Sequence, residues 1–212
     1  MRLILIIFIL FVNQVKANSI PLELGYGRFS LIDFGSLINS EPLVVDKSKA
    51  RVYSISGLDD DEAKSIIAIQ GLSKTGETDL TVDTQAGIYQ IHLKLNPGQG
   101  KDLMLGQRSR SRIITKKFTL SKSRSTIVKL DSHINQYILA ANPELVSYNN
   151  IKDYYETDFL KVFALVSKDQ TGTTDIVVPT RTGVYKFSIE ITGENNDHNS
   201  FIDFSSASSL RL

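Results

Sequence analysis

Two stretches of the chain alternate apolar and polar residues with a period of two. From Tyr89 to Leu95, every second residue is apolar and the residues between them are polar. The same alternation runs from Tyr185 to Ile191. Successive side chains of a β-strand point to opposite faces of its sheet. Both stretches therefore predict strands with one buried face and one solvated face.

These strands belong to a longer internal repeat. Residues 66–95 align with residues 162–191 at a constant offset of 96, and nine of the 30 aligned positions are identical. Such self-similarity indicates a copied structural unit, so we predict two small domains in tandem. The repeated motif consists of turn residues and buried positions, to which we assign structural roles: Thr75, Gly76, Thr78, Asp79, Gly87 and Tyr89, then Thr171, Gly172, Thr174, Asp175, Gly183 and Tyr185.

Each copy is predicted to end in three strands. Residues 66–69 and 162–166 are apolar on both faces, which is typical of a central strand. Hairpin turns at 85–87 and 181–183 join the next two strands, with Gly87 and Gly183 at positive φ. Shorter candidate strands precede them at 29–34, 43–45 and 51–55 in the first copy, and at 113–120, 126–130, 136–140 and 145–148 in the second. This spacing predicts a mainly β protein with two tandem small antiparallel β-sandwich domains of immunoglobulin-like type.

The N-terminus has the layout of a secretory signal peptide. Arg2 is followed by an apolar run from Leu3 to Val12, and Val15-Lys16-Ala17 resembles a cleavage site. The run is too short to span a bilayer, so we expect export without a stable membrane anchor after cleavage. The predicted boundaries are 1–17 for the signal peptide, 18–96 for the first domain, 97–112 for a basic linker, 113–193 for the second domain and 194–212 for a polar tail.

Composition narrows the function classes. The net charge is +1, so no bulk attraction to nucleic acid or to an anionic membrane follows. The chain has no cysteine, which excludes disulfides, thiol nucleophiles and thiolate metal sites. Stability must therefore come from packed apolar cores.

Residues that could perform catalysis are scarce. Neither His133 nor His198 has a metal-ligand spacing to another ligand, and His92 lies on the polar side of a strand. The acidic run 59–62 is either a solvated loop or a cation site, and the first alternative fits charge runs better. Asp79 and Asp175 are expected to stabilise the adjacent turns. We therefore predict no catalytic residue, no cofactor and no metal site.

A basic stretch separates the two copies. It offers candidate partner-binding residues for an acidic protein or an anionic lipid: Arg108, Arg110, Arg112, Lys116 and Lys117. The alternative is a flexible cationic spacer. Serines rather than aromatic residues alternate with the arginines, which does not favour binding of nucleic-acid bases.

The repeated block resembles a known domain family. The strand-turn-strand run occurs as 76-GETDL-80 with Gly87 and as 172-GTTDI-176 with Gly183, and the asparagine-proline step occurs as 141-ANPELV-146. These features resemble the pilus formation protein N-terminal family, the small domain that precedes secretin rings of type II and type III secretion and tight-adherence pilus systems. Family members usually continue into the ring-forming domain, which we do not expect here. The resemblance thus implies an accessory role.

Three functional hypotheses follow. The first is a non-catalytic exported accessory component of pilus or secretion-system assembly, which binds envelope proteins such as a secretin or a pilus component. The second is a secreted immunoglobulin-like adhesin or surface-binding module. The third, an enzyme or a sugar-binding protein with its site at the domain junction, is disfavoured because the chain has no tryptophan and no acid/base pair. The first two predict a periplasmic or a cell-surface location, respectively. The sequence does not specify the oligomeric state.

Overall fold

A computed structural model describes residues 19–55, 65–106, 113–134, 137–151, 161–193 and 200–204. These residues form β-strands and no α-helix. The first eight strands are β1 (Ile20–Gly25), β2 (Phe29–Asp33), β3 (Leu43–Val44), β4 (Ala50–Ser54), β5 (Ile66–Gly71), β6 (Gly76–Thr84), β7 (Gly87–Asn96) and β8 (Leu103–Met104). The others are β9 (Ile113–Ser121), β10 (Ser125–Lys129), β11 (Leu139–Ala140), β12 (Val146–Asn150), β13 (Val162–Ser167), β14 (Gly172–Pro179), β15 (Val184–Thr192) and β16 (Phe201–Asp203).

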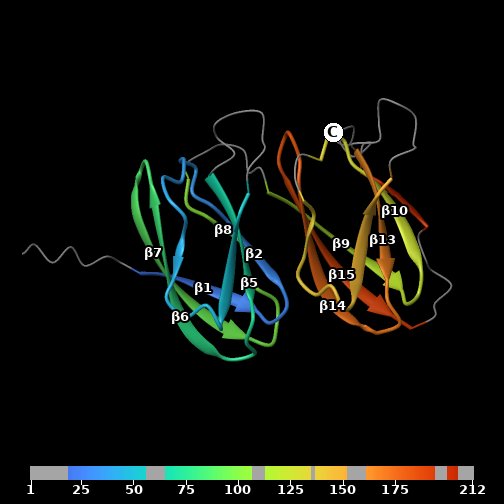
Figure 1. Ribbon diagram of the computed structural model, residues 1–212, viewed down its shortest axis with the longest axis horizontal. Coiled ribbons are helices and arrows are strands. Elements are labelled where there is room, and N and C mark those ends of the chain that lie inside the picture. Colours follow the sequence, from blue (N-terminus) through green and yellow to red (C-terminus); the bar gives the residue numbers. More distant parts are fainter. Residues whose placement is uncertain are drawn as a thin grey trace, which may run out of the picture.

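The strands build two β-sandwiches that stand side by side (Figure 1). Sheet β1-β7-β6-β3 packs on sheet β4-β5-β2-β8 in the first domain, and sheet β11-β14-β15-β9 packs on sheet β12-β13-β10-β16 in the second. In the first domain, β4-β5-β2 and β3-β6-β7 have the D-E-B and C-F-G order of an immunoglobulin domain. Strand β1 lies beside β7 in parallel, and β8 lies beside β2 in parallel. The fold is thus a tandem of immunoglobulin-like β-sandwiches, as predicted.

The duplication covers far more of each domain than the 30 aligned residues. Ile20 pairs with Ile91 between β1 and β7, and Lys116 pairs with Phe187 between β9 and β15, so both partners shift by 96. Strands β3 and β11, and strands β4 and β12, are also related by 96. The two copies therefore correspond residue by residue from 20–96 to 116–192 without an insertion. Strands β8 and β16 follow outside this register.

Each sandwich has its own apolar core. In the second domain, Tyr185 is buried among aliphatic side chains and Phe187, and its hydroxyl donates to Asp131 Oδ1 at 2.6 Å. In the first domain, Tyr89 is half-buried, and its ring centroid lies 5.2 Å from that of Phe34. Both repeated tyrosines thus face the interior, and the second is the more completely enclosed.

The middle two sheets pack against each other and create a third core. Along β5, Ile67 and Ile69 face the interior of the first domain, whereas Ile66 and Ala68 face the second domain. Val177 of β14 packs in this third cluster. The molecule is therefore a stack of four sheets (Figure 1). Both faces of β5 are buried, which explains why its sequence is apolar on both faces.

Several expectations need correction. The predicted polar tail contains β16, which pairs in parallel with β10, and the predicted linker contains β8. Of the two hairpin glycines, Gly87 has a φ of +132°, whereas Gly183, also within the described chain, is not in the positive-φ region. At that turn, the Thr180 hydroxyl accepts a hydrogen bond from the Gly183 N–H instead.

Some predicted segments lie outside the described residues. These are the signal peptide at 1–17, the acidic run 59–62 and most of the region after position 151 that separates β12 from β13. In the part of the chain that the structure does describe, there is no helix with the length and apolarity needed to cross a bilayer.

Candidate interaction surfaces

A buried ion pair crosses the contact between the two domains. Arg28, which precedes β2, places a guanidinium nitrogen 2.7 Å from Asp175 Oδ1 on β14, and their side chains are only 6% and 1% exposed. The same carboxylate accepts the Phe29 N–H at 2.9 Å and the Ser188 hydroxyl at 3.0 Å. A buried carboxylate is costly unless its oxygens find such donors. Three donors from two domains therefore fix the relative position of the sandwiches.

A second ion pair joins the domains through the chain segment that connects them. Asp102 immediately precedes β8, and its Oδ1 atom accepts the Leu31 N–H at 2.8 Å and Lys186 Nζ at 2.7 Å. Lys186 extends from β15 in the second domain, and its side chain is buried. The connecting segment is thus part of the interface.

Apolar side chains fill the rest of this interface. Phe29 and Leu31 from the first domain are fully buried with Val177 and Val184 from the second. Gln70 adds a hydrogen bond from its side-chain amide to the Ala141 carbonyl at 2.6 Å. Polar and apolar contacts thus both cross the boundary between the two sandwiches.

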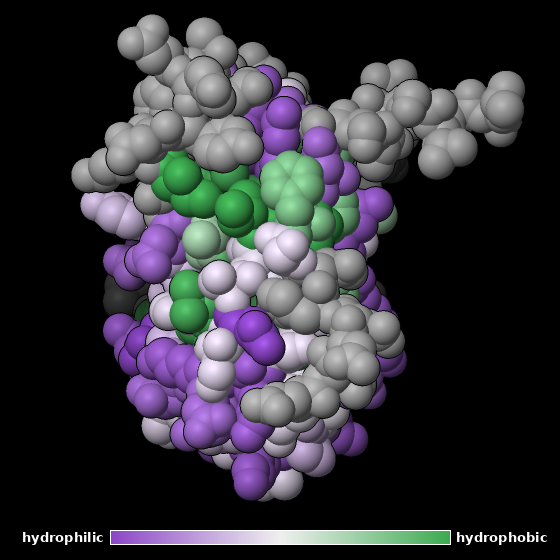
Figure 2. Space-filling view, turned by 90° about the vertical axis from the view of Figure 1, so that its right-hand side faces the viewer, coloured by the Kyte–Doolittle hydropathy of each residue, from purple (hydrophilic) through white to green (hydrophobic). Residues whose placement is uncertain are grey.

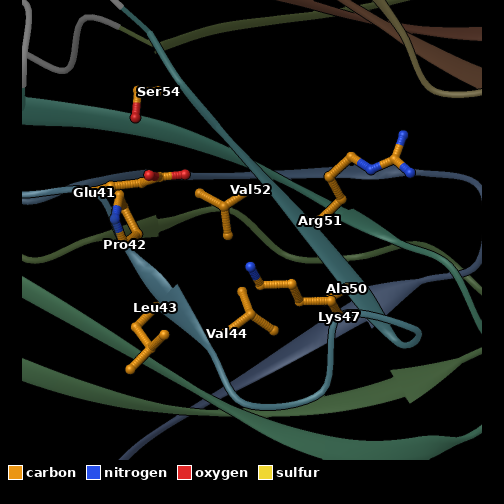
Figure 3. A pocket seen from close by; sticks show the side chains of 9 residues that line it. All are labelled: Glu41, Pro42, Leu43, Val44, Lys47, Ala50, Arg51, Val52 and Ser54. Carbon is orange, nitrogen blue, oxygen red and sulfur yellow. The ribbon is translucent and has the colours of Figure 1, made fainter.

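An open cleft lies at the edge of the first sandwich, between β3 and β4. It has a volume of about 520 Å³. Val44 and Val52 point toward its middle, whereas Leu43 and Arg51 point away from it (Figure 3). Val44 belongs to the core of this domain, and Val52 packs against that core. The floor of the cleft is therefore apolar. Lys47, whose side chain is exposed, also lines the cleft.

The two strands that border this cleft are edge strands. Strand β3 pairs only with β6, and β4 pairs only with β5, among the strands of the described chain. One backbone edge of each strand therefore has no strand beside it. Such an edge accepts an added strand from another protein, and an adjoining apolar cleft can receive its side chains.

The repeated threonines have the same structural role in both copies. Thr78 Oγ1 accepts the Asp46 N–H at 3.0 Å, and Thr174 Oγ1 accepts the Asn142 N–H at 3.1 Å. Both bonds attach the loop after β3 or β11 to the neighbouring strand of the same sheet, β6 or β14. Thr75 and Thr171, which are also repeated, are exposed at the turns.

The repeated aspartates do not stabilise turns as expected. Asp175 pairs with Arg28 in the domain interface, and Asp79 lies on the exposed outer face of β6. There the Asp79 carboxylate is 2.9 Å from His92 Nδ1, and the Glu77 carboxylate is 3.4 Å from its Nε2. The hydrogen bond with Asp79 is the main cause that raises the pKa of His92. The same motif residue therefore has a different partner in each copy.

The basic candidates do not gather into one site. Arg108, Arg110 and Arg112 lie outside the described residues. Lys116 on β9 places its ammonium 5.9 Å from the centre of the Phe204 ring. Lys117 is exposed and lines a hollow of about 210 Å³ at the rim of the domain interface. Among the described side chains, no cluster could hold a metal ion.

Sequence reasoning missed the residues that join the domains. Asp102 carried one signal, because it is the single acid in a basic stretch. Lys186 carried none, because the alternation from Tyr185 to Ile191 places its side chain on the face predicted to be solvated. Arg28 and Asp175 are 147 positions apart, and no local pattern connects them.

Comparison with known proteins gives only remote structural similarity. No protein-family model matches the chain, and no curated protein sequence matches it. The S-layer protein rSbsC(31-844) aligns with 76% of this chain and 21% of its own length, at 8% identity and a TM-score of 0.28. A tandem of titin immunoglobulin domains aligns with 82% of this chain and 93% of its own, at 10% identity and a TM-score of 0.23.

A third structure is a Bacteroides ovatus protein, SGBP-B of a mixed-linkage glucan utilization locus, in complex with a mixed-linkage heptasaccharide. It aligns with 81% of this chain and 43% of its own length, at 7% identity and a TM-score of 0.22. Of the first of these structures, the S-layer protein rSbsC(31-844), this chain spans about a fifth of the length. Similarities at this level carry no argument about function.

Proposed function

We propose that this protein is an exported, non-catalytic binding module that acts at the cell surface or in the envelope through contacts with other proteins. The cleft between β3 and β4 is the observation that carries this proposal. It combines two free strand edges with an apolar floor and a charged rim. This chemistry suits an extended peptide segment whose backbone pairs with an edge strand and whose apolar side chains enter the cleft.

The rigid joining of the two domains supports a binding role. Both buried ion pairs hold the sandwiches in one orientation, so the cleft is presented at a fixed angle to the rest of the molecule. Preorganisation of this kind lowers the entropy cost of binding. A display or scaffold module gains from such rigidity.

Two locations follow from the sequence. An accessory role in pilus or secretion-system assembly, as the resemblance to the pilus formation N-terminal family implies, places the protein in the periplasm. An adhesin-type or surface-binding role places it outside the cell. We favour the second, because the immunoglobulin-like tandem needs no secretin ring to account for its architecture.

The location is tested by labelling intact cells with a membrane-impermeant reagent. Labelling of the protein supports the surface role. Labelling that requires disruption of the outer membrane supports the periplasmic role, and recovery in the cytoplasm alone overturns both.

The cleft is tested by capture of partners from envelope extracts with the purified, tagged protein. Val52→Lys places a charge in the cleft and is expected to abolish capture of the partner. Tyr148→Lys is the matched control, because position 148 on β12 corresponds to position 52 on β4. Circular dichroism of both variants checks their folding. Equal capture by the wild-type protein and a folded Val52→Lys variant contradicts the proposed site.

A further inference from the structure

The surface with which the second domain binds the first has a counterpart on the first domain, and that counterpart is exposed. Leu139, Ala141 and Val184 pack in the domain interface. The offset of 96 maps them to Leu43, Val45 and Ile88, which lie together on the outer face of sheet β1-β7-β6-β3. These three side chains are 61%, 71% and 70% exposed. Large apolar side chains are thus exposed at the positions whose copies are covered inside the molecule.

The surface with which the first domain binds the second likewise has a counterpart, on the outer sheet of the second domain. Leu31 and Ala68 correspond to Ile127 and Ala164 on the outer face of sheet β12-β13-β10-β16. Both are only partly buried. Phe201 of β16 lies beside Ile127 in the sheet and is 49% exposed. Figure 2 looks onto this end of the molecule and shows hydrophobic residues gathered in one patch.

The charges of the buried ion pair in the interface are duplicated as well. Arg28 maps to Arg124, and Asp175 maps to Asp79. Arg124 is exposed beside the apolar patch of the second domain, and the Asp79 side chain is 62% exposed beside the apolar residues of the first. The two ends of the molecule therefore carry complementary halves of a contact that already exists within it.

We propose that the protein associates with further copies of itself, end to end, by repeating its internal domain contact. The outer face of sheet β12-β13-β10-β16 in one copy packs on the outer face of sheet β1-β7-β6-β3 in the next. Arg124 then pairs with Asp79 of the next copy, as Arg28 pairs with Asp175. Ile127, Ala164 and Phe201 cover Leu43, Val45 and Ile88 of that copy.

This contact leads to chains of copies. The two faces differ, so each copy uses one and leaves the other free for the next copy, which is a heterologous interface. The contact between copies is expected to be weaker than the internal one. Gln90 stands where Lys186 pairs with Asp102, and Ser125 stands where Phe29 fills the interface. The tether between domains also raises the effective concentration of the internal contact.

Sedimentation velocity of the purified protein, from micromolar to millimolar concentration, tests the proposal. We expect the mean mass to rise with concentration and to pass beyond a dimer. Arg124→Glu blocks one face and Ile88→Glu blocks the other, so each variant by itself is expected to associate at least about tenfold more weakly. An equimolar mixture of the two retains one intact pair of faces and is expected to give a heterodimer and nothing larger.

The controls separate this inference from the proposed function. Tyr137→Glu removes a highly exposed aromatic residue that has no counterpart in the domain interface, and it is expected to associate like the wild type. Val52→Lys, which tests the cleft, is likewise expected to leave sedimentation unchanged. Loss of partner capture with normal self-association, or the reverse, therefore shows which of the two ideas fails.

Two results overturn the proposal. One is a wild-type protein that remains monomeric across the whole concentration range, and this measurement depends on no variant. The other is a dimer of unchanged stability in either variant by itself, which indicates contact between identical faces. If either variant is unfolded by circular dichroism, Ile127→Lys and Val45→Glu replace the pair.

Discussion

Arg28 and Asp175, from different copies of the duplicated domain, meet at 2.7 Å in a place almost closed to water. Their counterparts Arg124 and Asp79 are both exposed, at opposite ends of the molecule. The same two positions of the repeat are therefore buried as a pair between the domains and exposed at the two ends. The difference arises because sheet β4-β5-β2-β8 of the first domain packs on sheet β11-β14-β15-β9 of the second, whereas the other two sheets face outward.

The buried ion pair should be far more important for stability than its exposed counterpart. Asp175→Ala leaves the Arg28 guanidinium buried without its carboxylate, so we expect a loss of about 3–5 kcal/mol in the free energy of unfolding. Asp79→Ala is the control and should cost at most about 1 kcal/mol, because its carboxylate is solvated. Urea unfolding at a concentration where the protein is monomeric measures both. Equal losses in the two variants would show that the interface contributes little.

The two repeated tyrosines should also differ. Tyr185 is fully enclosed, so Tyr185→Ala is expected to cost about 3–5 kcal/mol. Tyr185→Phe removes only the hydrogen bond to the exposed carboxylate of Asp131 and should cost about 1 kcal/mol. Tyr89→Ala should cost less than Tyr185→Ala, because its ring is half-buried. Chemical denaturation of the three variants checks this order, and a larger loss at Tyr89 would contradict it.

A side chain at Gly172 should strain the backbone. Its φ is +155°, and an added Cβ would lie 3.1 Å from Leu145 Cδ1. Gly172→Val is therefore expected to cost about 1 kcal/mol or more. Gly193→Val serves as the control, because an added Cβ there meets nothing within 4 Å. Thermal unfolding compares the two variants, and an unchanged midpoint for Gly172→Val would refute the assignment of strain.

His92 should titrate above its ordinary pKa. Its hydrogen bond with Asp79 favours the protonated ring, which raises the pKa in the folded state. The stability that this contact contributes is fully present below the unfolded-state pKa. It is lost as the pH rises through the raised folded-state pKa. NMR titration of the ring should show a lower pKa in Asp79→Asn than in the wild type, and identical titration curves would exclude this cause.

The strands of each domain were largely predictable because one face of each is buried. Alternation from Tyr89 to Leu95 located β7, and the doubly apolar run at 66–69 located β5. Strands β8 and β16 were missed because each is short and lies in a stretch whose polar or basic composition is typical of a linker or a tail. Strand β1 was missed because Pro21 and Gly25 weaken its alternation, so that Glu23 is the one polar residue between its apolar positions.

The candidate surfaces were much less predictable. Asp79 and Asp175 sit in the same motif, so no local rule distinguishes the exposed residue from the buried one. A difference was visible on the outer faces, where Thr81 in the first copy corresponds to Val177 in the second. That exchange indicates a covered face only once the layers are known to stack. The cleft depends on two short edge strands, and its shape follows from packing rather than from sequence pattern.

The four-sheet stack also bears on how the protein is made. Strand β2 places Phe29 and Leu31 in a cluster that the second copy completes. During synthesis, the first copy emerges from the ribosome before the second. Its apolar interface residues remain uncovered until the second copy has been synthesised. Each copy has its own core, but the cluster between the copies is complete only when both are present. In the nascent chain, the first half therefore exposes apolar side chains that can associate with other chains until the second half covers them.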